Sequence, residues 1–135
     1  MRCDLVSVHQ VDQFWPLLAK GMAKSCERSG GGLVAGDVWR ECRSGSAWLI
    51  VATDDETTIH GASVWYLQTG ASGAWLRCMA LYGTKMKAWK DDMRALARRI
   101  AADCGAVGLK SDGRRGMKAM YPTARVKHVY YEEAL

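Results

Sequence analysis

A strand–helix–strand pattern in residues 74–110 constrains the fold of this chain more than any other part of the sequence. Ala74–Tyr82 is a mostly apolar run, and its length and lack of a 3.6-residue period predict a buried strand. Beyond a glycine turn, apolar residues recur every three or four positions, which predicts the chain's longest helix, with Thr84 as N-cap and Gly105 as its stop. The apolar stripe consists of Met86, Trp89, Met93, Leu96, Ile100 and Cys104. A strand at Ala106–Lys110 follows, so we expect two parallel strands joined by a right-handed crossover.

Hydrophobic periodicity and turn residues predict the remaining elements. The elements expected before this unit are an edge strand at 5–8, helices at 11–28 and 36–42, and a hairpin of strands at 47–53 and 58–68. Those expected after it are a short helix at 114–120 and a closing strand at 125–132. The inner face of the first helix is expected to hold Phe14, Leu17, Leu18, Met22 and Cys26. The order is β-α-α-β-β-β-α-β-α-β, which predicts one α+β domain over residues 1–135 with a mixed sheet.

Composition favours a soluble globular domain. Hydrophobic residues make up 49% of the 135 residues, with only two prolines. No apolar run approaches the roughly 20 residues of a membrane helix, and the N-terminus lacks the apolar core of a signal peptide. The five cysteines are widely spaced without a C-x-x-C pattern, which favours free thiols in a reducing cytosol. Because His9, His60 and His128 are far apart in sequence, we expect structural histidines and no metal site.

A glycine-rich run at Ser29–Gly32 follows the helix expected at 11–28. Loops that cradle phosphate follow a strand and open a helix, which is not the order found here. We therefore interpret this run as a helix stop and a flexible joint.

Charge is distributed unevenly along the chain. Residues 1–84 carry seven basic and eight acidic side chains, whereas residues 85–135 carry twelve basic and six acidic ones. The asymmetry fits either a solvated helix face or an anionic partner, such as a phosphate-bearing cofactor, nucleic acid or an acidic protein. A nucleic-acid site would use Lys85, Lys87, Lys90, Arg94, Arg98 and Arg99. Asp91 and Asp92 interrupt this basic set.

The element order resembles the fold of the GNAT acetyltransferases across nearly the whole chain, which implies a three-layer sandwich. Two short stretches add to the resemblance, Cys104–Val107 and Gly113–Met117. Together they are similar to small GNAT-like proteins encoded by phages and prophages, in which a Gly–Arg pair opens the last helix.

The resemblance fails at the turn that holds the cofactor. GNAT members that bind acetyl-CoA carry a [QR]-x-x-G-x-[GA] turn, whose N–H groups and helix N-terminus hold the pyrophosphate. The corresponding segment here is Leu81–Lys87, and only Gly83 is retained. If acetyl-CoA binds, the resemblance implies Gly83, Thr84, Lys85 and Lys87 as its contacts. Both lysines would oppose the dipole of a helix that starts at this point.

The resemblance also implies a candidate general acid. The tyrosine that reprotonates the thiolate leaving group in this family corresponds to Tyr121, and the asparagine often found seven residues earlier is Arg114 here. The alternative interpretation is that Tyr121, next to Pro122, is an aromatic residue at a helix end that packs on the core.

Three functions remain open. The first is a non-catalytic GNAT-fold protein of a phage, acting in the virion or its assembly through contacts with other virion proteins or itself. It needs no cofactor and is expected in the host cytoplasm or the particle; the six tryptophans favour contact surfaces. The second is an N-acetyltransferase that uses acetyl-CoA. The third is a module that binds nucleic acid weakly through Lys85, Lys87, Lys90, Arg94 and Arg98.

Overall fold

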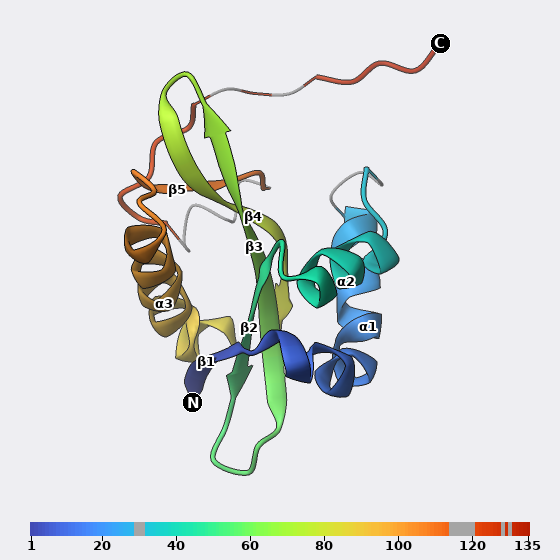
Figure 1. Ribbon diagram of the computed structural model, residues 1–135. Coiled ribbons are helices and arrows are strands. Elements are labelled where there is room, and N and C mark those ends of the chain that lie inside the picture. Colours follow the sequence, from blue (N-terminus) through green and yellow to red (C-terminus); the bar gives the residue numbers. More distant parts are fainter. Residues whose placement is uncertain (29–31, 114–120, 128, 130) are drawn as a thin grey trace.

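The fold is a three-layer α+β sandwich around one mixed sheet (Figure 1). The computed structural model describes residues 1–28, 32–113, 121–127, 129 and 131–135. The strands are β1 (Arg2–Val6), β2 (Trp48–Thr53), β3 (Ile59–Gly70), β4 (Gly73–Gly83) and β5 (Leu109–Ser111). They lie in sequence order, antiparallel from β1 to β4, and β5 is parallel to β4. The predicted meander, the edge position of the first strand and the parallel crossover are confirmed.

Helices cover both faces of this sheet. The described helices are the 3-10 turn η1 (Val8–Gln10), α1 (Val11–Arg28), α2 (Ala35–Ser44), the 3-10 turn η2 (Met86–Ala88) and α3 (Lys90–Asp103). Figure 1 shows α1 and α2 on one face and α3 on the other. The helix predicted at 11–28 has those bounds, and α2 extends beyond the predicted 36–42 at both ends. At 18 residues α1 is longer than α3 at 14, so the expectation that α3 is the longest helix was wrong.

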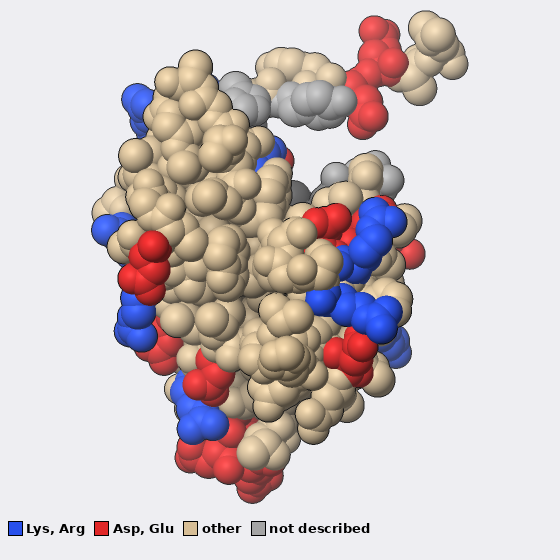
Figure 2. Space-filling model, in the orientation of Figure 1, with Lys and Arg blue, Asp and Glu red and all other residues tan. Residues whose placement is uncertain are grey.

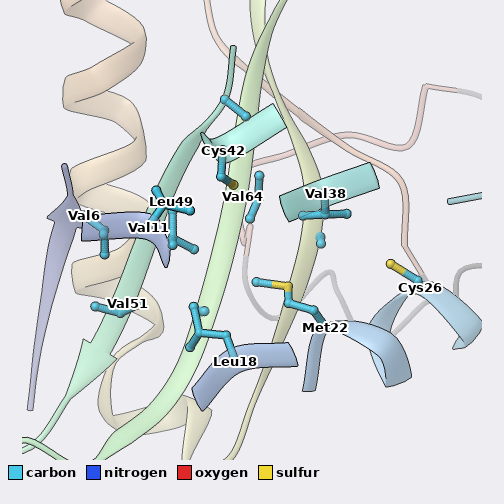
Figure 3. Close-up of a cluster of buried hydrophobic side chains, with 13 residues drawn as sticks. Val6, Val11, Leu18, Met22, Cys26, Val38, Cys42, Leu49, Val51 and Val64 are labelled. Atoms are coloured by element: carbon cyan, nitrogen blue, oxygen red, sulfur yellow. The ribbon is translucent and has the colours of Figure 1, made fainter. Parts of the chain in front are cut away.

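The sheet separates two hydrophobic cores because successive strand side chains point to opposite faces. On β2, Leu49 and Val51 face the core under α1 and α2, where Leu18 and Met22 of α1 meet them (Figure 3). Ile50 and Ala52 face the core under α3. Each core is covered by one helical layer, so loss of either layer would expose a hydrophobic core to solvent.

One predicted core residue lies in solvent. Leu17 has a relative exposure of 70%, whereas Leu18 next to it is fully buried. Adjacent helix positions are about 100° apart, and the buried stripe of α1 runs through Leu18, Met22 and Cys26. Leu17 therefore falls outside the stripe.

The start of α3 was predicted five residues too early. Lys85 adopts a left-handed conformation (φ 54°), and a 3-10 turn follows it. Trp89, not Thr84, is the N-cap residue of α3. Met86 and Trp89 have helical spacing, but spacing of three residues also fits a 3-10 turn, so periodicity could not locate the boundary. Because Lys85 and Lys87 precede α3, they do not stand in its first turn.

Several strand predictions also differ from the structure. The first strand covers Arg2–Val6 instead of 5–8, because a hydrogen bond from Gln10 N–H to the Ser7 carbonyl starts η1. The strand expected at 106–110 is β5, Leu109–Ser111. No described residue of 125–132 is in a strand, and Val126 and Tyr131 are 76% and 86% exposed. Alternation alone does not make a strand when no neighbouring strand supplies hydrogen bonds. The helix expected at 114–120 and most of the joint at 29–32 lie outside the described residues.

Close packing of α1 on β4 yields a stability prediction for Gly21. A Cβ at Gly21 would overlap the ring of Tyr82. Gly21→Ala should therefore lower the free energy of unfolding by about 1–3 kcal/mol, although alanine normally stabilises a helix interior. Gly36 of α2 is the matched control, because a Cβ there meets nothing within 4 Å. Gly36→Ala should raise stability by up to about 1 kcal/mol in the same urea titration. Equal stabilisation by both substitutions would contradict the packing of α1 against Tyr82.

Candidate functional site

The candidate site lies where β4 and β5 separate. β4 pairs with β3 along its whole length but with β5 only over Leu76–Cys78. Met79 is the extra residue of a β-bulge, because Cys78 pairs with Trp65 and Ala80 with Val64. From residue 79 to 83, no strand among the described residues pairs with the β5 side of β4. Along this stretch the main-chain groups on that side of β4 have no strand partner among the described residues.

A serine of α1 satisfies part of this open edge. The Ser25 hydroxyl donates to the Leu81 carbonyl (2.9 Å) and accepts from the Leu81 N–H (3.3 Å). This contact was not predictable from local pattern, since Ser25 is a buried polar residue on an otherwise apolar helix face. Because Ser25 takes up both main-chain groups of Leu81, fewer groups of β4 lack a hydrogen-bond partner than the strand pairing alone indicates.

Tyr121 packs at the point of divergence. It contacts the core under α3, and its buried hydroxyl makes no hydrogen bond of normal geometry with the described residues. Burial, followed by the nearby Cys78 thiol, raises the pKa of Tyr121 above its ordinary value, and Ser111 and Arg94 only partly offset the rise. The interpretation of Tyr121 as an aromatic residue that packs on the core is supported, and its hydroxyl lies near Ser111 of β5.

The thiol beside it is not an activated nucleophile. Burial raises the pKa of Cys78 to about 12, with a smaller contribution in the same direction from Asp112. Thiolate is the reactive form of cysteine, so Cys78 is protonated and unreactive at neutral pH. All five cysteines are free thiols, as predicted.

A shallow cavity of about 300 Å³ lies beside the middle of β4, at Arg77, Cys78 and Met79. It is lined by Leu33, Tyr66, Arg77, Cys78, Met79 and Asp112. Arg77 and Asp112 form an ion pair that joins β4 to the residue after β5. This pair was not predicted from the sequence, because Arg77 and Asp112 become neighbours only through the parallel pairing of β4 with β5.

The turn after β4 is closed by its own hydrogen bonds. Thr84 N–H donates to the His60 carbonyl (2.8 Å), and Ala88 N–H donates to the Lys85 carbonyl (2.9 Å). The indole Nε1–H of Trp89 donates to the Thr84 carbonyl (2.8 Å). These N–H groups serve the chain itself and are not free to hold an anion.

The Trp89 ring occupies the space that glycine leaves at this turn. A Cβ at Gly61 or at Gly83 would lie 2.5 Å from Trp89 Cζ2. In a phosphate-binding turn, a glycine lets the ligand approach the backbone. Here Gly83 instead lets a buried tryptophan approach.

Charges of both signs lie at the start of α3. Asp91 and Asp92 are exposed in the first turn, where negative side chains stabilise the helix by their interaction with its dipole. Lys85 and Lys87 are exposed nearby, and neither is part of the helix. The charge is therefore mixed, and it is the closed turn, with the Trp89 ring beside Gly83, that does not fit the pyrophosphate of acetyl-CoA.

The other candidate residues do not form a single site. Arg94 donates to the Thr123 hydroxyl (3.1 Å), while Arg98 and Arg99 are exposed on α3 together with three aspartates, Asp91, Asp92 and Asp103. His60 pairs with Asp54 inside the β2–β3 hairpin, and its Nε2 lies 2.7 Å from Asp54 Oδ2. Over the part of the chain that the structure describes, no three His, Cys, Asp or Glu side chains are placed to hold a metal ion. Arg114 and His128 lie outside the described residues.

No helix in the described part of the chain is both long and apolar enough to cross a membrane.

Comparison with known proteins gives structural matches only, since neither a protein-family model nor a curated protein matches the chain. A probable acetyltransferase has a TM-score of 0.72 and 16% identity, over 100% of this chain and 97% of that one. Ribosomal-protein-alanine N-acetyltransferase from Brucella melitensis biovar Abortus has a TM-score of 0.64 and 16% identity, over 100% of both chains. A GNAT family acetyltransferase from Staphylococcus aureus has a TM-score of 0.62 and 10% identity, over 98% of this chain and 97% of that one. The chain therefore has the GNAT acetyltransferase fold.

Proposed function

We propose that this chain uses the GNAT fold to make contacts with other proteins, and that it does not transfer acyl groups from CoA. The observation that carries this proposal is the closed turn after β4. Trp89 fills the space beside Gly83 and hydrogen-bonds to Thr84, so a pyrophosphate would meet an indole ring and a satisfied backbone. Opening the turn would expose a large buried side chain, which makes binding by rearrangement costly.

The state of Tyr121 supports the same proposal. A general acid works best when its pKa lies near the operating pH. Burial raises the pKa of Tyr121 instead, so the phenol is a weaker proton donor than an ordinary tyrosine.

The setting of a phage particle rests on sequence resemblance alone. Residues 104–107 and 113–117 are similar to GNAT-like proteins of phages and prophages. We therefore propose a role in the virion or its assembly, in the host cytoplasm or the particle.

A second candidate is an acyl-CoA N-acetyltransferase. Two observations favour it, the place of Tyr121 where β4 and β5 diverge and the fold shared with proteins named acetyltransferases. In that case Tyr121 would be the acid that protonates the leaving thiolate, and the donor would bind without the usual pyrophosphate turn.

Titration calorimetry with acetyl-CoA separates the two candidates. We expect no binding in the low micromolar range, because Trp89 fills the space beside Gly83 and the N–H groups of Thr84 and Ala88 are already hydrogen-bonded within the chain. The Brucella enzyme named above, titrated in the same buffer, serves as the positive control.

A charge variant tests whether the carboxylates at the start of α3 or the closed turn at Trp89 prevent the binding of acetyl-CoA. Asp91→Asn with Asp92→Asn removes two exposed carboxylates from the start of α3. We expect this variant to remain without binding, since Trp89 still closes the turn. A low-micromolar dissociation constant for the unaltered chain would instead establish the acetyltransferase candidate, and turnover lost in Tyr121→Phe would then assign the acid.

A further inference from the structure

The strand β1 leaves one side of the sheet open. It is the outermost strand, and among the described residues it pairs only with β2. In Figure 1 it crosses in front of the other strands. An edge strand presents unpaired N–H and C=O groups, which can accept a strand from another chain.

The two charges on β1 have opposite signs and lie two residues apart. Arg2 and Asp4 are on the same face, since their side chains form an ion pair (Nε–Oδ2 2.9 Å). Both side chains are exposed, at 77% and 51%. Charged residues on an edge strand usually oppose pairing, but this arrangement is self-complementary when the strand meets an antiparallel copy of itself.

We propose that two copies of the chain pair through β1, antiparallel, about a twofold axis at Cys3. In this register Arg2 lies opposite the partner's Asp4, and Asp4 lies opposite the partner's Arg2. Directly opposed side chains of opposite charge stabilise a strand pair, whereas like charges destabilise it. A register centred on Asp4 would place Asp4 opposite the partner's Asp4, so charge selects the register centred on Cys3.

Apolar residues support the same register on the other face. Met1 would lie opposite the partner's Leu5, which is 47% exposed in the single chain. Figure 2 shows mostly uncharged residues across the middle of this side of the molecule. Pairing would cover apolar surface as well as backbone groups.

The proposed contact is closed by its symmetry. Both copies contribute the same surface, as in an isologous dimer. Once they pair, neither copy has an unpaired β1 edge. The opposite edge, β5, has only three residues and offers little to a further copy. The assembly therefore stops at two chains, whether or not the function proposed above is correct.

A charge exchange tests the register. Sedimentation equilibrium of the full chain should give twice the 14.9 kDa chain mass. Arg2→Asp alone and Asp4→Arg alone should each give the monomer mass, because each opposes like charges across the axis. The double variant, Arg2→Asp with Asp4→Arg, should regain the dimer. A monomeric unaltered chain, an unchanged mass in the single variants, or a double variant that stays monomeric would each overturn the proposal.

Oxidative cross-linking tests the position of the axis. Opposed residues of an antiparallel pair have Cα atoms about 4.5–5.5 Å apart, within the range that a disulfide spans. Burial raises the pKa of Cys3 to about 11, so an oxidation catalyst such as copper–phenanthroline is needed. We expect a dimer band that is lost in Cys3→Ser and retained in Cys104→Ser, whose thiol lies at the far end of α3. A dimer band that survives in Cys3→Ser would overturn the register.

Discussion

Trp89→Ala is expected to lower the free energy of unfolding by about 3–5 kcal/mol, because it removes a fully buried indole and leaves a cavity. The total stability of a domain of this size is only about 5–15 kcal/mol. The indole packs in the core under α3 and also donates a hydrogen bond to the Thr84 carbonyl. Trp89 is the N-cap residue of α3 but makes no side-chain cap bond, so the loss reports packing and turn closure.

Two further variants serve as references for the loss of stability in Trp89→Ala. Arg98→Ala changes an exposed residue of the same helix and should alter stability by less than about 0.5 kcal/mol. Trp89→Phe keeps part of the ring and should fall between the two. All three are compared by urea denaturation at one pH and one protein concentration. Small and equal effects of Trp89→Ala and Arg98→Ala would contradict the burial of the indole.

Elements whose signal is local were predictable from the sequence. α1 has the predicted bounds because its stripe of Leu18, Met22 and Cys26 can be read within a single helix. The meander was predictable for the same reason, since polar turns separate apolar runs that each meet the rules for a strand. Trp89 was correctly placed in the core by its spacing from Met93.

What the sequence did not reveal depends on contacts between distant residues. The true start of α3 follows from the fit of Trp89 against Gly61 and Gly83, and Gly61 lies 28 positions away. The surroundings of Tyr121 depend on the parallel pairing of Cys78 with Ser111. The strand predicted at 125–132 had the right alternation, yet no rule of local pattern states whether another strand is available to pair with it.

The same reasoning explains why the candidate site could be predicted only in part. Loss of the pyrophosphate turn was visible from Leu81–Lys87, since a missing glycine is a local feature. The reason for retaining Gly83 was not visible. By its place in the sequence this glycine resembles the remnant of a cofactor turn, whereas in the structure it lies against Trp89.

Gly61→Ala is expected to destabilise the fold by about 1–3 kcal/mol, because its methyl group would have no room. The new Cβ would lie 2.5 Å from Trp89 Cζ2 and 2.8 Å from the Tyr82 carbonyl oxygen. The carbonyl belongs to the neighbouring strand and cannot move without disturbing the sheet. The matched control is Gly70→Ala, also in β3, where a Cβ meets nothing within 4 Å. There the substitution should be close to neutral, because Gly70 is the last residue of β3 and a Cβ there has room.

A double-mutant cycle shows whether Trp89 is the cause of this cost. Phenylalanine at position 89 lacks the second ring that approaches Gly61, so part of the overlap disappears. Gly61→Ala should therefore cost less in the Trp89→Phe background than in the unaltered chain, with a coupling energy of about 0.5–3 kcal/mol. The part of the cost that remains measures the contact with the Tyr82 carbonyl. Additive effects within about 0.5 kcal/mol would mean that the indole does not press on Gly61. The space between Gly61, Gly83 and Trp89 would then be less tightly filled than the structure indicates, which would weaken the steric argument against cofactor binding.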